Sequence, residues 1–214
     1  MPPANPVATA TEPTTKPAIR RLRRDELPAG TVQLARFLIG KTLVRELPRG
    51  RLSGRIVETE AYLPDDAACH AFRGPTPRNR SLFLEHGHAY VYFIYGSSFM
   101  MNVSGEKPGI GAGVLIRALE PLEGIELMSR HRRTERVTDL ARGPGRLAEA
   151  FRIDHRLDGV DLCAPGPIWL GTAIRRRGKI GESRRIGITR DAHLVLRFYE
   201  RGNPFVSGPA RLRA

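Results

Sequence analysis

The stretch from Arg51 to Tyr62 constrains the fold more than any other part of the sequence. It contains two adjacent β-branched residues, which favour an extended chain. Proline and aspartate follow at residues 64–66, where such a strand would end. A second extended stretch, Lys41 to Leu47, precedes it, and a turn at residues 48–50 joins the two. This pattern predicts a β-hairpin of two antiparallel strands.

The longer predicted strand carries two acidic side chains among apolar ones. Because successive side chains of a strand point to opposite faces, the residues divide into two sets. One face is predicted to carry Glu58, Glu60 and Tyr62, and the other Val57, Thr59 and Ala61. A carboxylate held beside an aromatic ring on a rigid strand is a candidate general base that faces a flat substrate. An exposed strand edge whose acids pair with arginines is a second interpretation that these residues alone leave open.

The charge of the chain is strongly positive. Its 35 lysines and arginines exceed its 22 acidic residues, which gives a net charge of +13 and indicates a polyanionic partner. The sequence contains no run of about 18 apolar residues, the length needed to span a bilayer. No basic helix with a strong apolar face stands out. We therefore expect nucleic acid as the partner, and no membrane. A general preference for arginine explains part of the excess, but not why the acids fail to balance it.

Length and composition favour a single domain. At 214 residues the chain can bury a sizeable core. Residues 1–18 are rich in proline, alanine and threonine, and we expect them to form a disordered tail. Two cysteines, Cys69 and Cys163, make no disulfide framework, and the start of the chain lacks the pattern of a secretory signal. These features favour a cytoplasmic protein.

A second hairpin is predicted from Ala89 to Val103. Two apolar runs flank the turn at residues 96–98. Tyr90 and Tyr92 share one face, and Tyr95 falls at the mouth of the turn. A ring that projects from a hairpin tip can wedge into a stack of bases, whereas a tyrosine packed over its own turn is the structural alternative.

The remaining pattern predicts further strands and helices. Strands are expected at residues 113–119 and 193–199, and helices at 31–40 with Thr31 as cap, at 121–133, and from Gly143 to Phe151. Arg117 stands inside the first of these strands and needs an anion beside it, either a strand carboxylate such as Glu60 or a substrate phosphate. Asn102 lies between two apolar residues, where its amide either satisfies a backbone group or faces the polar edge of a ligand.

Basic loops offer candidate phosphate contacts. Arg78 and Arg80 lie in a loop rich in glycine and proline, where guanidinium groups can bind phosphate oxygens, although an ordinary surface loop fits equally well. Gly143 begins a predicted helix whose free amide groups form a candidate phosphate seat. The segments 175–179 and 184–187 are read as further basic loops. Cys69 and His70 with residues 85–88 match no standard metal pattern, and no cofactor motif is present, so we expect neither.

Several segments together resemble the alkyladenine (3-methyladenine, N-methylpurine) DNA glycosylases. They follow the same order from about Leu34 to Val206, and are residues 55–62, 68–70, 76–80, 90–96, 101–103, 114–124, 142–145 and 196–199. The resemblance implies a single α+β domain, residues 19–214, with a curved, mainly antiparallel β-sheet and flanking helices. It also implies a protruding β-hairpin that intercalates into DNA.

The same resemblance implies a function. The enzyme would be a monofunctional DNA glycosylase of base excision repair, acting as a monomer without cofactor on double-stranded DNA that contains damaged purines. It would flip an alkylated or deaminated purine out of the duplex and hydrolyse the N-glycosidic bond with a Glu-activated water, leaving an abasic site. We expect it in the cytoplasm, associated with the nucleoid. A non-catalytic protein that senses damaged DNA is the alternative, and an RNA-modifying hydrolase is a third interpretation.

The resemblance also assigns roles to individual residues. Glu60 corresponds to the general base, and Arg117 to the arginine that holds the site and the backbone of the flipped nucleotide. Tyr62, His70 and Tyr92 correspond to the residues that contact the extruded base, Asn102 to an asparagine that disfavours guanine, and Tyr95 to the intercalating tyrosine. We expect Arg78, Arg80 and Gly143 to contact DNA. The chain departs from the family at Ser97 and Ser98, where better-known eukaryotic members carry a bulkier pair, and near Arg184, where an arginine replaces a common proline.

Overall fold

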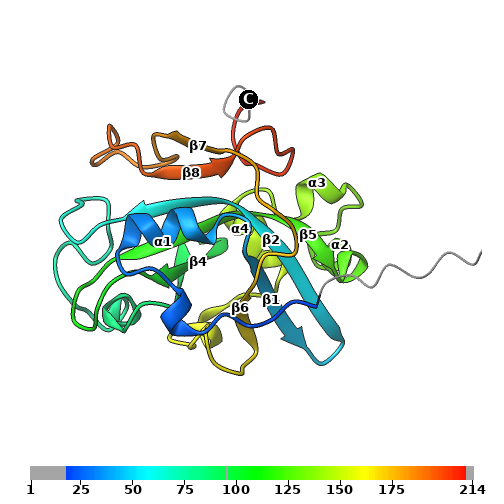
Figure 1. Ribbon diagram of the computed structural model, residues 1–214, viewed down its shortest axis with the longest axis horizontal. Helices are drawn as coiled ribbons and strands as arrows, with labels where there is room; N and C mark the ends of the chain where they lie inside the picture. The colour runs from blue at the N-terminus through cyan, green and yellow to red at the C-terminus, as the bar shows by residue number, and fades with distance from the viewer. Residues whose placement is uncertain (1–17, 95, 211–214) are drawn as a thin grey trace, which may run out of the picture.

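The longest strand, β2 (Gly50–Tyr62), pairs with three neighbours and organises the sheet (Figure 1). The structure is a computed structural model that describes residues 18–94 and 96–210. Its strands follow the order β3-β4-β5-β2-β1-β6, and β8 also pairs with β2 and with β7. The other strands are β1 (Thr42–Leu47), β3 (Ala89–Ile94), β4 (Ser98–Ser104), β5 (Gly113–Glu123), β6 (Ile168–Gly171), β7 (Ile180–Ser183) and β8 (Arg197–Glu200). All these pairings are antiparallel.

Few helices accompany the curved sheet. They are α1 (Thr31–Leu38), α2 (Ile125–Arg132), α3 (Val137–Leu140) and α4 (Pro144–Ala150). Helix α1 packs on β2 through a buried apolar side that includes Leu34 and Leu38, while α4 packs against β4 and β5. The predicted single α+β domain with a curved antiparallel sheet is confirmed. Among the described residues, no helix has both the length and the apolar character needed to cross a bilayer.

Both predicted hairpins are present. Strands β1 and β2 pair from Thr42 opposite Arg55 to Leu47 opposite Gly50. Strands β3 and β4 pair from Ala89 opposite Val103 to Ile94 opposite Ser98. The rings of Tyr90 and Tyr92 stack with centroids 5.2 Å apart, which confirms that they share a face. Tyr95 and the predicted tail up to residue 17 lie outside the described residues.

The predicted helix at residues 121–133 is too long at its start. Strand β5 continues through Pro121, which lies opposite Gly54, where the register shifts. An irregular register tolerates a residue that cannot donate a backbone hydrogen bond. Gly124 has a φ of 73°, a left-handed conformation that glycine adopts without strain, and helix α2 begins directly after it.

Other local predictions need correction. Thr31 is not the cap of α1. Its backbone N–H and hydroxyl both donate to Oε1 of Glu106, at 2.9 and 2.8 Å, so a distant carboxylate satisfies the start of the helix. The last strand begins at Arg197 rather than His193, because residues 191–193 form a turn. Strands β6 and β7 and helix α3 were not predicted.

A β-bulge interrupts the alternation of side chains along β2. The register against β5 shifts between Ile56 and Thr59. Val57, predicted to share a face with Thr59 and Ala61, packs instead in a small cluster with Ala118, Tyr199 and Val206. Thr59 and Ala61 keep the other face, where the Thr59 hydroxyl donates to the Ala35 carbonyl of α1. Bulges often redirect side chains beside functional sites, and this one lies directly before the two acids of β2.

Candidate active site

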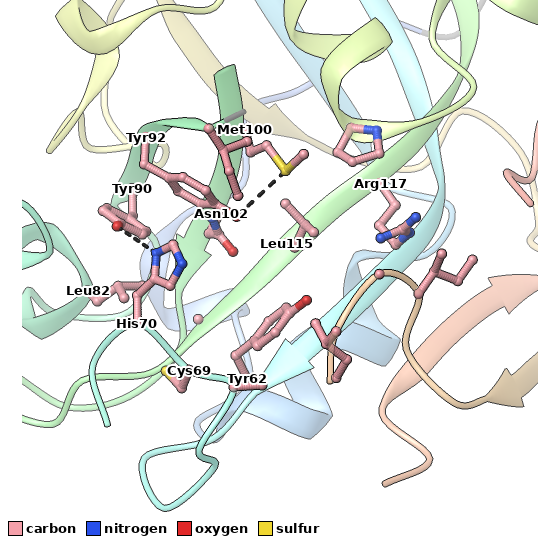
Figure 2. A pocket seen from close by; sticks show the side chains of 17 residues that line it. Tyr62, Cys69, His70, Leu82, Tyr90, Tyr92, Met100, Asn102, Leu115 and Arg117 are labelled. Carbon is pink, nitrogen blue, oxygen red and sulfur yellow. Dashed lines mark hydrogen bonds between the residues drawn. The ribbon is translucent and has the colours of Figure 1, made fainter. Parts of the chain in front are cut away.

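A cavity of about 360 Å³ lies between β2, the β3–β4 hairpin, β5 and the loop after β7 (Figure 2). Aromatic and apolar side chains make up most of its wall, with a few polar groups among them, which is typical of a small-molecule site. The lining side chains that carry chemistry are Tyr62, His70, Tyr90, Tyr92, Met100, Asn102 and Arg117. Every substrate-binding residue predicted from the sequence therefore borders this cavity.

Aromatic rings form two sides of the cavity. Figure 2 shows Tyr62 across the cavity from Tyr92. The ring of His70 meets that of Tyr92 edge-on, with centroids 4.5 Å apart, and its Nδ1 lies 3.0 Å from the Tyr90 hydroxyl. Burial, with a contribution from Arg78, lowers the pKa of His70, so its imidazole is neutral at pH 7. The opening between these rings suits a flat, apolar group.

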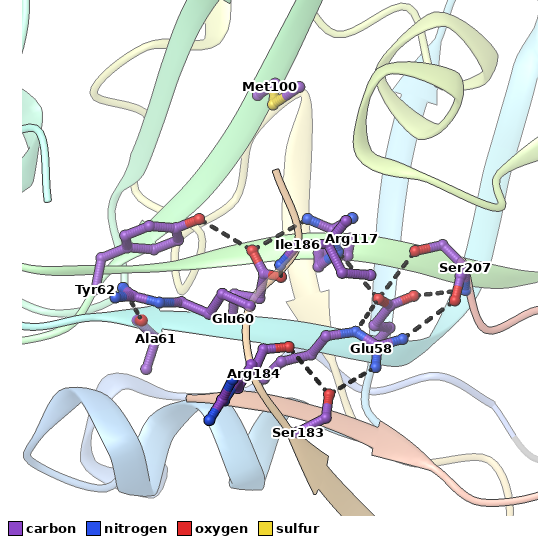
Figure 3. Close-up of polar contacts among 12 residues, drawn as sticks. Glu58, Glu60, Ala61, Tyr62, Met100, Arg117, Ser183, Arg184, Ile186 and Ser207 are labelled. Carbon is purple, nitrogen blue, oxygen red and sulfur yellow. Dashed lines mark hydrogen bonds and ion pairs between the residues drawn. The ribbon is translucent and has the colours of Figure 1, made fainter. Parts of the chain in front are cut away.

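Glu60 lies immediately behind the cavity wall. Its side chain is fully buried. Oε2 accepts hydrogen bonds from the Tyr62 hydroxyl at 2.9 Å and from Nη1 of Arg117 at 3.0 Å, and Oε1 accepts from the Ile186 backbone N–H at 2.8 Å (Figure 3). Glu60 does not itself line the cavity, but all three donors do. Burial, then the charge of Glu60, raises the pKa of Tyr62, which keeps its hydroxyl protonated as a donor.

Arg117 connects Glu60 to a second carboxylate. Only 7% of the residue is exposed, and its Nε donates to Oε1 of Glu58 at 3.0 Å. Burial opposes the charged form, but Glu60 and Glu58 outweigh burial and raise the pKa of Arg117. The anion that Arg117 needs is therefore a strand carboxylate, one of the two interpretations left open by the sequence, and the arginine also borders the cavity.

Asn102 presents an amide at the cavity wall. It lies on β4 opposite Tyr90 and Leu115, and the residue is 5% exposed. Its Nδ2 is buried and has no hydrogen-bond partner within the described part of the chain. A buried amide without a partner is costly unless a ligand supplies one, so this group is available to the edge of a bound molecule.

A match to a family model identifies the class of protein that contains this cavity. The model of methylpurine-DNA glycosylase (MPG) matches residues 25–204. The chain belongs to the methylpurine-DNA glycosylase family. This confirms the resemblance drawn from the sequence, and with it the class of enzyme: this glycosylase is a hydrolase of N-glycosyl bonds and a DNA-repair protein.

Similar full-length proteins agree with the family. A putative 3-methyladenine DNA glycosylase of Mesorhizobium japonicum is 66% identical over 192 residues, which cover 90% of this chain and 92% of that protein. One of Paraburkholderia phytofirmans is 53% identical over 191 residues, with 89% and 90% covered. One of Methanocella arvoryzae is 47% identical over 193 residues, with 87% and 95% covered.

The loop after β7 holds the glycosylase site from one side. Arg185, predicted as part of a basic loop, is instead buried, and its guanidinium binds the carboxylate of Asp66. It also donates to the Ala61 carbonyl at 3.0 Å and lies 4.6 Å from the centroid of the Tyr62 ring. These contacts fix the loop so that Ile186 reaches Glu60. No local pattern predicts these contacts, because Asp66 is 119 positions from Arg185.

Sequence reasoning also missed the partners of Glu58. This fully buried carboxylate accepts from Arg197 Nε at 2.7 Å and from the Ser207 hydroxyl at 2.9 Å, both at Oε1. Oε2 accepts from the Ser207 backbone N–H at 2.6 Å. An arginine in the apolar strand β8 was the available signal, since a buried cation needs an acid beside it.

Two of the residues expected to bind DNA, Arg78 and Gly143, lie next to residues that line the cavity, Tyr92 and Pro144. Arg78 is exposed and donates to the Phe93 carbonyl at 3.1 Å, and its guanidinium lies 5.8 Å from the centroid of the Tyr92 ring. Arg80 is exposed at the start of a short 3-10 helix, Arg80–Phe83. Gly143 precedes α4 and lines a second groove together with Ser97 and Ser98 of the hairpin. In the described part of the chain, no group of three or more His, Cys, Asp or Glu side chains is placed to hold a metal ion.

Proposed function

We propose that this glycosylase hydrolyses the N-glycosidic bond of alkylated or deaminated purines that are flipped out of double-stranded DNA, as a monofunctional enzyme of base excision repair. It acts as a monomer without cofactor in the cytoplasm, where DNA binding associates it with the nucleoid. The observation that carries this proposal is the placement of Glu60, whose three hydrogen-bond donors all border the aromatic cavity.

The cavity is suited to select damaged purines by charge. Alkylation at N3 or N7 makes a purine cationic, and a cation is attracted to the faces of tyrosine rings by roughly 0.5 to 2 kcal/mol per contact. Tyr62 and Tyr92 offer such faces across the cavity. Asn102 faces the edge of the base and disfavours the exocyclic amine of guanine. These contacts bind a flipped cationic purine more tightly than its unmodified counterpart.

Hydrolysis uses the Glu60 carboxylate as general base. Within the described part of the chain, its Oε1 accepts a single hydrogen bond, from Ile186, and a carboxylate oxygen can accept more than one. This oxygen takes a proton from water while the water oxygen bonds to the sugar C1′ atom. The bond from C1′ to the purine nitrogen breaks, and its electron pair leaves with the base. A cationic purine departs neutral, and the product is an abasic site with a hydroxyl on C1′.

A neutral lesion such as hypoxanthine makes a poorer leaving group. It needs a hydrogen bond or a proton at the base, and His70 is the candidate donor. Because burial lowers its pKa, His70 is neutral at pH 7 and offers a hydrogen bond rather than a full proton. Release of neutral lesions is therefore expected to be slower than release of cationic ones.

The surface around the cavity is proposed to hold the duplex. Tyr95, which follows β3 in the sequence, intercalates where the nucleotide has left the stack. Arg78 and Arg80 on one side, and Gly143 at the start of α4 on the other, contact phosphates. The positive net charge of the chain adds a contribution that is independent of sequence.

The test is an excision assay on defined duplexes. Each duplex contains one 3-methyladenine, hypoxanthine or ethenoadenine, and base release is read as an alkali-labile site on the lesion strand. We expect release from at least one lesion and none from an undamaged duplex. Tight binding to a lesion duplex without release of any base would support a damage-sensing protein instead, and preferential action on RNA would support an RNA-modifying hydrolase.

A further inference from the structure

A second carboxylate lies beside the proposed base and has no assigned role. Glu58 precedes Glu60 by two residues on β2, and both side chains are fully buried. The same guanidinium connects them, because Arg117 donates through Nε to Glu58 and through Nη1 to Glu60, each at 3.0 Å. The register of β2 against β5 shifts on both sides of Glu58.

The charges of this network balance. We call it the Arg117 cluster: two carboxylates, Glu58 and Glu60, and two guanidinium groups, Arg117 and Arg197. None of the four residues is more than 7% exposed. In a buried group of this kind, removal of one charge leaves its partner uncompensated in a medium of low dielectric constant. The electrostatic environment of Glu60 therefore depends on Glu58.

Glu58 is anchored from elements outside the cavity. It accepts hydrogen bonds from Arg197 on β8 and from the hydroxyl and backbone N–H of Ser207 near the C-terminal end. Burial opposes its ionisation, but Arg117 and Arg197 outweigh burial and lower the pKa of Glu58. Its charge is thus present at neutral pH, and its position is fixed by four donors.

We propose that Glu58 is a positioning residue for base release: it fixes the Arg117 guanidinium and offsets its charge, so that Arg117 orients Glu60 without weakening it as a base. This role rests on the proposed function. With Nε held by Glu58 and Nη1 by Glu60, Nη2 has no hydrogen-bond partner among the described residues, and Arg117 borders the cavity. The arrangement leaves the N–H groups of Nη2, at one edge of the guanidinium, for the flipped nucleotide.

Other charged groups around Glu60 balance one another. Tyr62 is protonated, and Arg185 is paired with Asp66. Replacing Glu58 by glutamine therefore leaves one guanidinium uncompensated beside Glu60. An extra positive charge favours an ionised carboxylate, which moves the acidic limb of the pH–rate profile to lower pH. A carboxylate stabilised in this way is a weaker base, so the rate at neutral pH falls.

The test compares Glu58→Gln with Glu200→Gln. Glu200 is a matched control because it is also a buried carboxylate that binds an arginine and a backbone N–H, but its arginine, Arg55, does not border the cavity as Arg117 does. Base release from a hypoxanthine duplex is measured under single-turnover conditions across pH, with the dissociation constant for the same duplex. We expect Glu58→Gln to lower the rate at neutral pH by up to about a hundredfold, the lower end of what a general base contributes. It should also move the acidic limb of the pH–rate profile to lower pH and change binding little. Glu200→Gln should keep the wild-type rate and limb.

Several outcomes overturn the inference. If Glu58→Gln keeps the wild-type rate and the wild-type acidic limb of the pH–rate profile, Glu58 has no role in positioning Glu60. A slower rate with an unmoved acidic limb would make Glu58 merely structural. If Glu58→Gln does not fold, as judged by circular dichroism, Glu58→Asp replaces it, since aspartate keeps the charge but shortens the side chain. A reduced rate with the wild-type dissociation constant for the duplex then supports the proposal, and an unchanged rate refutes it. If the wild-type chain releases no base from any lesion duplex, the proposed function itself fails and the role of Glu58 falls with it.

Discussion

Two clusters of buried ion pairs lie along the same strands of this glycosylase, and they differ in their surroundings. In the Arg55 cluster, Arg55 of β2 binds Glu200 of β8 and lies 3.3 Å from Glu120. In the Arg117 cluster, both carboxylates belong to β2. The two clusters share their chemistry and their burial, but only the Arg117 cluster borders the cavity. Burial and ion pairing alone therefore do not identify a catalytic carboxylate.

The donors to each carboxylate explain the difference. Glu200 accepts hydrogen bonds from Arg55, from the Gly178 N–H and from the amide of Asn203, and these groups hold strands and loops together. The donors to Glu60 all border the cavity, so a bound base can change the hydrogen bonds that they make to Glu60. Glu60 is thus joined to the cavity through its donors, although its own carboxylate is covered.

The largest effect is expected from a substitution in the Arg117 cluster, at the proposed general base. Glu60→Gln should lower base release by about 10²- to 10⁴-fold, the usual contribution of a general base, and should retain binding to a lesion duplex. The measurement is single-turnover release together with the dissociation constant for the duplex. Glu200→Gln is the control and should release base at the wild-type rate. Excision that survives in Glu60→Gln would mean that another residue activates the water.

Much of the fold followed from the sequence because its signals are local. The two hairpins combine alternating apolar residues with turn residues a few positions apart, and both are present. Strands β6 and β7 have four residues each and form through pairing with β1 and β8, so their own residues carry little signal. The bulge at Val57 is also invisible locally, since it depends on the register against β5.

The site divides in the same way. Glu60 and Tyr62 share a face of one strand, and Arg117 needed an acid, so their meeting could be expected from residue types alone. The residues that the sequence did not reveal are joined to them over long distances along the chain: Ile186 is 126 positions from Glu60, and Arg197 is 139 positions from Glu58. Such contacts exist only once the tertiary structure has formed. The roles drawn from the family resemblance stay predictions until the variants are measured.

A substitution in the Arg55 cluster should change the stability of the protein rather than its rate of base release. Burial opposes ionisation of Glu200, but Arg55, the Gly178 N–H and Asn203 lower its pKa to about 2, below the ordinary value of 4.5. A carboxyl whose pKa is lower in the folded state than in the unfolded state stabilises the protein at pH values above the unfolded-state pKa. This stabilisation is lost as the pH falls through the folded-state pKa. We expect the wild type to lose stability from about pH 4.5 towards pH 2, and Glu200→Gln to lose less. Urea unfolding midpoints across this range measure it, and parallel declines in both proteins would contradict it.

A smaller effect sharpens the account of the cavity. Tyr92→Leu removes one aromatic face and keeps an apolar side chain, so it should weaken binding of a cationic purine by roughly 0.5 to 2 kcal/mol and affect a neutral lesion less. The measurement is the ratio of release rates for 3-methyladenine and hypoxanthine at subsaturating enzyme. Phe37→Leu, on α1 outside the cavity lining, is the matched control. An equal loss for both lesions would show that Tyr92 supports shape rather than charge recognition.

The smallest expected effect tests whether Arg80 makes a defined DNA contact or adds only to the positive net charge of the chain. Arg80 is exposed at the start of the 3-10 helix Arg80–Phe83, and Arg49 is exposed at the β1–β2 turn. Neither has an ion-pair partner among the described residues. Each phosphate contact releases counterions, so losing one contact lowers the slope of log K against log salt by about 1. Arg80→Ala should therefore flatten the salt dependence of duplex binding, while Arg49→Ala should leave the slope unchanged. Equal slopes in the two variants would mean that Arg80 adds only to the general positive potential, because a diffuse charge attracts DNA without fixing its path across the cavity.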